Sequence, residues 1–263
     1  MKLYLDGIGL VGPGLPDWPS AAPVLAGSID YVPAPVALSP SPLLPPAERR
    51  RMTETVKLAL AVGQEAIAAA GRSAADLPSV FASSGADGVT ITAILEILAS
   101  SEREVSPTRF HNSVHNAPSG YWSIATQCRQ SSTSLCAFDF SFGAGLVEAA
   151  VLALDEGRPV LLVCYDVPYP AALDAVRPLA ASFGVALVLS TVPGPGSLAA
   201  LTLEFGLGTV PETPVEIPAL EALRLGNPAA RALPLLAAIA KGQGTAALAM
   251  MAGNRLTLTV TPA

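Results

Sequence analysis

The sequence has few charged residues and few aromatic ones. Charged residues make up 14% of its 263 positions and aromatic residues 5%, whereas hydrophobic residues make up 51%. Such a composition leaves little polar surface to cover the protein, and large exposed apolar patches usually mark interaction sites. We therefore expect part of the surface to be buried against another protein subunit.

Basic residues are scarce, and the formal net charge is −6. A nucleic-acid-binding face is excluded because phosphate binding needs a basic surface. We interpret the one basic run, Glu48 to Arg51, as a solvated helix start. The three cysteines have neither metal-ligand spacing nor an even disulfide framework, so we expect no metal site and a reducing cytoplasm.

Long apolar runs are also missing. No run reaches the ~18 residues needed to cross a bilayer, and the apolar start of the chain is too short for a secretory signal. Neither a phosphate loop nor a dinucleotide loop is present, and the two histidines support no Ser-His-Asp arrangement. We expect no membrane span and no cofactor.

Segments with strand patterns alternate with segments of helical periodicity. Strands are predicted at residues 3–12, 79–88 (ending in a glycine turn), 159–166, 183–192, 198–207 (as an edge strand) and 255–262. Helices are predicted at 47–70, 89–99, 118–126, 141–156, 171–179 and 227–241. Residues 11–46 and 106–117 are predicted to be irregular or extended. The alternation predicts an α/β fold, and near-continuous apolar strands indicate a sheet covered by helices on both faces.

The most informative stretch is residues 106–157, SPTRFHNSVHNAPSGYWSIATQCRQSSTSLCAFDFSFGAGLVEAAVLALDEG. It resembles the N-terminal half of the thiolase-fold ketosynthases, in particular the short beta-ketoacyl synthase-like proteins of aryl polyene and xanthomonadin-type pathways. Residues 44–71 are similar to another ketosynthase helix. The resemblance covers residues 1–205 and implies a truncated thiolase-like fold with a mixed central sheet. We expect one domain over residues 1–263, with 206–263 as an unassigned C-terminal extension.

A catalytic ketosynthase carries its nucleophilic cysteine at the N-terminal end of the helix that matches residues 141–156. Counting back along this helix places Phe140 there. The condensation also needs donors that stabilise an enolate, typically two histidines from the C-terminal half, and His111 and His115 both precede the helix. The resemblance therefore implies a non-catalytic subunit of chain-length-factor type. It would pair with an active ketosynthase, as a heterodimer or larger assembly, and meet acyl carrier protein through that complex.

Two groups of residues are candidates for this role. Phe138, Phe140 and Phe142 either fill a vestigial acyl tunnel or are ordinary core, and Asp139 between them is interpreted as the helix cap. The other group, Ser113, Val114, His115 and Asn116, forms either a partner interface or a set of bonds to buried backbone groups.

Cys136 leaves an alternative open, because Ser134-Leu135-Cys136-Ala137 is faintly similar to the signature around the catalytic cysteine. A stand-alone acyltransferase or thioesterase would use this thiol. The match moves it away from the helix N-terminus that helps to lower a cysteine pKa, so we expect a small buried residue, as for Cys128 and Cys164. A homodimeric module that binds only carrier protein is a third hypothesis.

Overall fold

The structure is a computed structural model that describes residues 1–101, 103–208 and 211–263. In these residues eight strands form one sheet, in the order β3-β2-β4-β5-β1-β6-β8-β7. The strands are β1 (Lys2–Val11), β2 (Ser79–Ala82), β3 (Ser132–Leu135), β4 (Val160–Asp166), β5 (Phe183–Ser190), β6 (Ala199–Leu207), β7 (Gly244–Ala249) and β8 (Asn254–Thr261). The sheet is mixed, as predicted: β2 is parallel to β3 and β4, and the other pairs are antiparallel.

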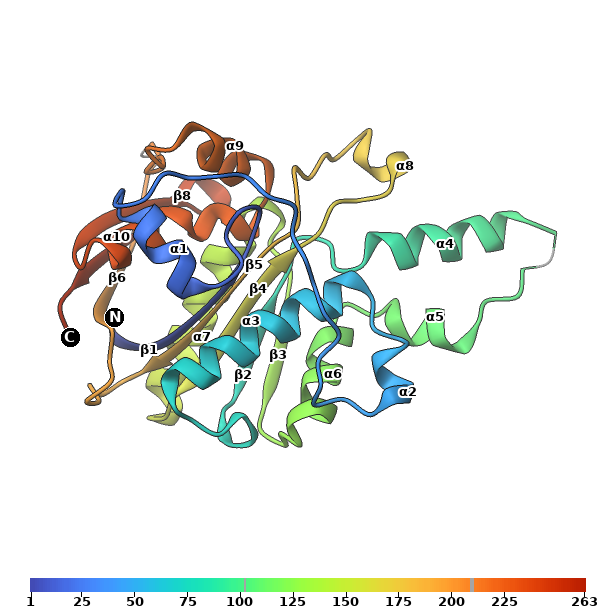
Figure 1. The fold of residues 1–263 in the computed structure, drawn as a ribbon, viewed down its shortest axis with the longest axis horizontal. Helices are drawn as coiled ribbons and strands as arrows, with labels where there is room; N and C mark the ends of the chain where they lie inside the picture. The colour runs from blue at the N-terminus through green and yellow to red at the C-terminus, as the bar shows by residue number, and fades with distance from the viewer. Residues whose placement is uncertain (102, 209–210) are drawn as a thin grey trace.

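Helices cover both faces of the sheet (Figure 1). They are α1 (Trp18–Leu25), α2 (Pro46–Arg49), α3 (Glu54–Ala70), α4 (Gly88–Ala99), α5 (Pro107–Asn112), α6 (Ala117–Thr126), α7 (Ser141–Glu156), α8 (Ala171–Asp174), α9 (Pro218–Gly226) and α10 (Leu233–Ala240). α3 packs on β1, β4 and β5, and α6 packs on α3. α7 lies against β2 and β4, and α10 lies against β7 and β8.

The central strands are apolar on both sides, as expected for a covered sheet. Along β4, Leu162 and Cys164 belong to the core on the α7 side, whereas Leu161 and Val163 belong to the core on the α3 side. β1 achieves a close approach to α3 by a different means. A Cβ atom at Gly9 would lie 1.9 Å from the carbonyl oxygen of Val62, so only glycine fits beneath the helix backbone there.

The predicted helix over residues 47–70 is interrupted: α2 ends at Arg49, and residues 50–53 are not helical. Thr53 is extended, and its hydroxyl accepts a hydrogen bond from the Val56 amide, so α3 begins only after it. The end is as predicted: Gly71 takes the left-handed conformation, with φ of 60°. α7 has both predicted bounds, and Gly157 ends it in the same way, with φ of 63°.

Other expectations also fail: α1 lies within residues 11–46, α8 ends at Asp174, and α10 begins only at Leu233. Residues 107–112 form α5 instead of an extended segment, because Pro107 suits a first helical turn and the Ser106 side chain accepts from the Arg109 amide. β6 is an interior strand, paired with β1 on one side and β8 on the other. Its polar residues Thr202 and Glu204 face away from the core that contains Leu201 and Leu203. This alternation of polar and apolar residues is also typical of an edge strand, which explains the wrong prediction.

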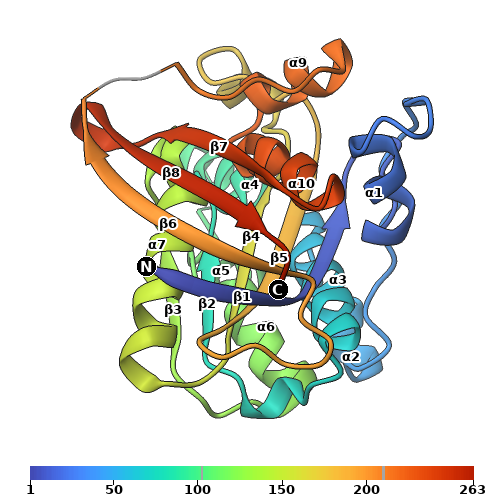
Figure 2. The same ribbon diagram turned by 90° about the vertical axis from the view of Figure 1, so that its left-hand side faces the viewer.

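The C-terminal extension completes the sheet. Figure 2 shows β8 and β7 continuing it beyond β6, with α10 beneath them. Leu256, Leu258 and Val260 of β8 join the same core as Leu201 and Leu203. Residues 209 and 210 of this extension lie outside the described residues.

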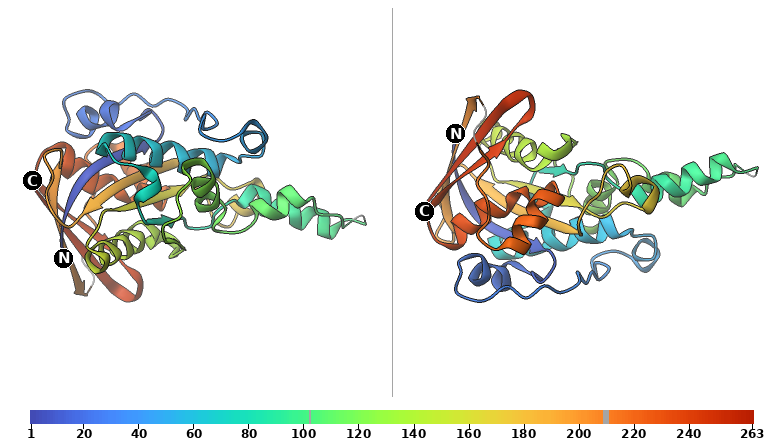
Figure 3. Two further views of the ribbon diagram at one scale, coloured as in Figure 1. Left: turned by 90° about the horizontal axis from the view of Figure 1, so that it is seen from below. Right: turned by 90° about the horizontal axis from the view of Figure 1, so that it is seen from above.

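An arm made of α4 and α5 projects from the body of the protein (Figures 1 and 3). α4 has the sequence GVTITAILEILA, in which Glu96 is the only charged residue. None of its large apolar side chains is buried, and Val89, Leu95 and Leu98 are exposed together with Phe110 of α5. An isolated protein would not hold so apolar a helix in water without cost.

Candidate functional site

The candidate site lies where the three parallel strands end. β2, β3 and β4 run in the same direction, so the loops that follow Ala82, Leu135 and Asp166 gather at one edge of the sheet. Ligands of α/β proteins bind at this edge, outside the carboxyl ends of the strands. The predicted residues Cys136, Phe138 and Phe140 lie in the loop after β3.

Phe138 occupies a strained turn between β3 and α7. Its φ is +53°, a left-handed conformation that costs a residue with a Cβ atom roughly 1–2 kcal/mol. The Ser141 hydroxyl holds the turn by donating to the Phe138 carbonyl oxygen at 2.7 Å and accepting from the Ala137 amide at 3.1 Å. Strained residues of this kind cluster at functional sites.

Arg177 covers this turn from the segment after α8. Its guanidinium carbon lies 3.5 Å from the centre of the Phe138 ring, and its Nη2 donates to Asp139 Oδ1 at 3.0 Å. The predicted cap by Asp139 is therefore wrong, since this carboxylate pairs with Arg177 and α7 has no side-chain cap. The sequence did not predict a role for Arg177, because no motif around it indicates a contact with Asp139, 38 residues earlier in the chain.

The three phenylalanines lie in different surroundings. Phe138 is 56% exposed, Phe140 is half-buried and immediately precedes the first residue of α7, and Phe142 is fully buried in the core. Phe142 belongs to the same core as Leu146 and as Val80 of β2. The structure therefore brings them to one helix end without gathering them in one cavity.

Cys136 is exposed, so the expectation of a buried thiol is wrong for this residue, whereas Cys128 and Cys164 are buried as predicted. Its Sγ donates to the Ser84 carbonyl oxygen at 3.0 Å, which requires the protonated thiol. It precedes Phe138 by two positions and therefore lies outside the first turn of α7.

His115 lies close to the same turn. Its Nε2 is 3.3 Å from the Ser83 carbonyl oxygen, a contact that fits the expectation of a histidine bonded to backbone. Asn116 occupies the cap position of α6 without a side-chain cap bond, and it is exposed, as is Val114. Ser113 donates to the Phe110 carbonyl oxygen. The four candidate residues are thus adjacent, and all four are at least partly accessible.

Asp166, at the end of β4, is the buried acid of the site. Its Oδ1 accepts hydrogen bonds from the Ser83 hydroxyl, the Ser84 amide and the Ser84 hydroxyl at 2.8–3.1 Å. Burial raises the pKa of Asp166 to about 6, although the bonds from Ser84 and Ser83 oppose the rise. Asp166 was not predicted as a site residue. The sequence did contain a signal for it, because a carboxylate directly ends a continuous apolar strand.

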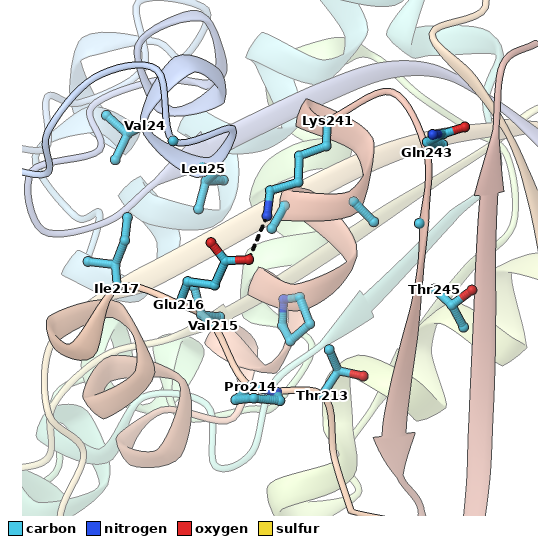
Figure 4. A pocket seen from close by; sticks show the side chains of 15 residues that line it. Val24, Leu25, Thr213, Pro214, Val215, Glu216, Ile217, Lys241, Gln243 and Thr245 are labelled. Carbon is cyan, nitrogen blue, oxygen red and sulfur yellow. Dashed lines mark hydrogen bonds and ion pairs between the residues drawn. The ribbon is translucent and has the colours of Figure 1, made fainter.

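Within the described residues, no group of three or more His, Cys, Asp or Glu side chains is arranged to hold a metal ion. A hollow of about 250 Å³ lies elsewhere, between α1, α10, the start of β7 and residues 213–217 (Figure 4). An ion pair between Lys241 and Glu216, 2.9 Å long, crosses it. It contains none of the predicted residues, and α1 and α10 are at the opposite end of the molecule from the arm (Figure 1).

Two exposed features flank the candidate site. β3 is a terminal strand of the sheet, and no other strand of the described residues pairs with its outer edge. The apolar arm begins directly after the loop that follows β2. Free strand edges and exposed apolar helices both favour association with another chain. No helix in the described part of the chain combines the length and apolarity needed to cross a membrane.

This sheet, with α7 on one face and α3 on the other, is the thiolase-like ketosynthase fold. Residues 27–250 match the family described as beta-ketoacyl synthase, N-terminal domain. The chain belongs to this family. No curated protein matches the chain.

Solved structures share the fold at low sequence identity. A chain from the complex of a ketosynthase (ApeO) with its chain length factor (ApeC) from Xenorhabdus doucetiae is 20% identical, with a TM-score of 0.75, and the match covers 98% of this chain and 99% of that one. A chain of the ishigamide ketosynthase/chain length factor is 14% identical, with a TM-score of 0.73 and 99% of each chain covered. The match to the ketosynthase from module 1 of the bacillaene synthase from Bacillus amyloliquefaciens FZB42 is 14% identical, with a TM-score of 0.59, and covers 81% of this chain but 47% of that chain.

Proposed function

We propose that this chain is a non-catalytic ketosynthase-like subunit of chain-length-factor type. It pairs with an active beta-ketoacyl-ACP synthase, in a heterodimer or larger assembly, and meets acyl carrier protein through that complex. Aryl polyene-like polyketide or fatty acid synthesis is the pathway class, in the cytoplasm. The full-length match to a chain of the ApeO–ApeC complex supports this choice of partner.

One observation carries the proposal: the residues that directly precede α7, from Ala137 to Phe140, include no thiol. Covalent tethering of an acyl chain needs an activated nucleophile, and the residues from Phe138 to Phe142 supply none. Phe140 precedes α7 where the nucleophile is expected, and the strained residue of the same turn is Phe138. We therefore assign both rings to a vestigial site, with Phe138 covered by Arg177. Phe142 is assigned to its supporting core.

The proposed interface joins the outer edge of β3, the exposed face of α4 and the segment from Ser113 to Asn116. These features flank the same strand ends, and the arm has the apolar surface that a permanent subunit interface requires. A ketosynthase that covers the arm would account for the low charge content of the chain. Leu95 and Leu98 of α4 are the residues that we expect to be most affected by pairing.

Co-expression with a candidate ketosynthase, followed by size-exclusion chromatography with light scattering, tests the proposal. We expect a complex with equal amounts of the two chains, and we expect Leu95→Asp to abolish it. Val192→Asp is the matched control, because Val192 is also an exposed apolar residue but lies outside the arm, after β5. A wild-type chain that remains a monodisperse monomer beside every candidate ketosynthase would refute the pairing.

A further inference from the structure

The dipeptide Ser83–Ser84 connects all three loops of the candidate site. Its two carbonyl oxygens are engaged by His115, at the start of the α6 region, and by Cys136, after β3. Its hydroxyl groups and the Ser84 amide all donate to Asp166, at the end of β4. A single short turn therefore sets the relative positions of segments that come from residues 83–87, 113–117 and 136–140.

The same turn also leads into the arm. The Ser83 hydroxyl accepts from the Ala86 amide at 3.0 Å, and Ala86 adopts a left-handed conformation with φ of 54°. Asp87 follows and caps α4 by accepting from the Thr90 amide at 2.9 Å. The direction in which α4 leaves the body thus depends on how Ser83 is held, and Asp166 holds it.

We infer that Asp166 is a positioning residue for the partner-facing surface, acting through Ser83 and Ser84 on α4 and on the start of α6. The part of this inference that concerns a partner rests on the proposed function. Asp166 is buried, and its backbone pairs with Phe183 of β5. Its side-chain oxygen Oδ1 accepts from Ser83 and Ser84, while Oδ2 makes no hydrogen bond. Burying a carboxylate without a compensating cation costs folding free energy. The carboxylate of Asp166 nevertheless holds its three hydrogen-bond donors in place, because hydrogen bonds to a charged group are strong.

Several titratable groups surround this cluster. Cys164 and Tyr165 precede Asp166 on β4, Asp87 begins α4, and His115 and Cys136 contact the dipeptide from α6 and β3. None of them makes a hydrogen bond with Asp166 itself. The effect of the carboxylate is therefore transmitted by the two serines. The inference can be tested by combining a substitution of Asp166 with a substitution of Ser84 and comparing the double variant with the single ones.

Amide hydrogen exchange on the isolated chain tests the positioning directly. In Asp166→Asn, we expect faster exchange at the Ser84, Ala86 and Thr90 amides and a thermal midpoint that is unchanged or higher. Glu65→Gln is the matched control, because Glu65 is a partly buried carboxylate that accepts from two backbone amides, those of Leu10 and Trp18. It should affect those two amides and leave the Ser84 turn protected. Unchanged exchange at the Ser84 turn in Asp166→Asn would overturn the inference.

Partner affinity supplies the second measurement. We expect Asp166→Asn to weaken the complex about tenfold, the loss expected from weakening hydrogen bonds to a charged group. Glu65→Gln should bind as tightly as wild type. If the effect passes through Ser84, Ser84→Ala combined with Asp166→Asn should bind no more weakly than the weaker single variant. If wild type forms the complex and Asp166→Asn forms it with the same affinity, the inference fails while the proposed function stands. If wild type pairs with no ketosynthase, the proposed function fails, and the exchange experiment still decides the positioning role.

Discussion

The guanidinium of Arg177 stacks on the ring of Phe138 at 3.5 Å while it pairs with the neighbouring carboxylate of Asp139 at 3.0 Å. One side chain from the segment after α8 thus covers the turn that precedes α7. A cation over an aromatic face contributes about 0.5–1 kcal/mol at a partly exposed site. The contact ties the segment after α8 to this turn.

The first prediction concerns backbone strain at Phe138. Because φ there is +53°, glycine adopts this conformation without the penalty that any Cβ atom incurs. Phe138→Gly and Phe138→Ala both remove the ring, so their difference isolates the strain. We expect Phe138→Gly to be more stable than Phe138→Ala by about 1 kcal/mol in urea unfolding. Equal stabilities would show that the turn relaxes.

The second prediction separates Phe140 from Phe142. Phe142 is fully buried, so Phe142→Ala should destabilise the chain by about 3–5 kcal/mol. Phe140 is half-buried and lies just before the N-terminus of α7, so Phe140→Ala should destabilise the chain much less. With the partner present, we expect Phe140→Ala to change the length of the product or the assembly of the pair. An unaltered product distribution from an intact complex would argue against the proposed role of Phe140.

The third prediction is a pH dependence of stability. The pKa of Asp166 is raised to about 6 in the folded state, so the folded chain holds this proton more tightly than the unfolded chain does. The contribution of Asp166 to stability should therefore fall as pH rises from about 4 to about 6, by on the order of 2 to 3 kcal/mol, and stay level above.

Asp166→Asn removes this titration. Burial raises the pKa of Glu65 as well, so the wild-type curve alone is not sufficient. Denaturant unfolding of both proteins between pH 4 and pH 8 gives the difference between them. A difference that is constant across this range would contradict the prediction.

The fourth prediction concerns Cys136. Because this thiol is exposed while Cys128 and Cys164 are buried, iodoacetamide should label Cys136 alone in the folded protein. Labelling should be slow, since the thiol is held in a hydrogen bond to the Ser84 carbonyl oxygen. Mass spectrometry after incubation with acyl-CoA or acyl carrier protein should find no stable acyl group. An acyl group on Cys136, absent from Cys136→Ser, would favour the stand-alone enzyme.

The sequence allowed prediction of elements whose signals are local. α7 was predicted at both ends, because apolar residues follow a helical period and Gly157 takes the conformation that ends a helix. β4 and β5 were predicted from continuous apolar runs. β3 and β7 were missed: the first is a short polar segment, STSL, and the second, GTAALA, is rich in a helix-favouring residue.

The candidate site was less predictable, because its contacts join distant parts of the chain. The turn before α7 follows from residue order, but Arg177 reaches it only through the placement of the segment after α8. Likewise, Asp166 meets Ser84 because β2 and β4 are neighbours, a pairing across 82 residues. Pairing between strands is decided by the whole sheet, and no local pattern encodes it.

The outer position of β8 and β7 has a consequence for dissecting this protein. A fragment that stops at residue 208 would retain the ketosynthase-like segments, yet β6 would lose its neighbour and Leu201 and Leu203 would lose Leu256 and Leu258. Such a fragment would present an open, hydrophobic strand border and should precipitate. Shortened versions used to map partner binding therefore need to keep the last two strands, or a loss of binding will merely report misfolding.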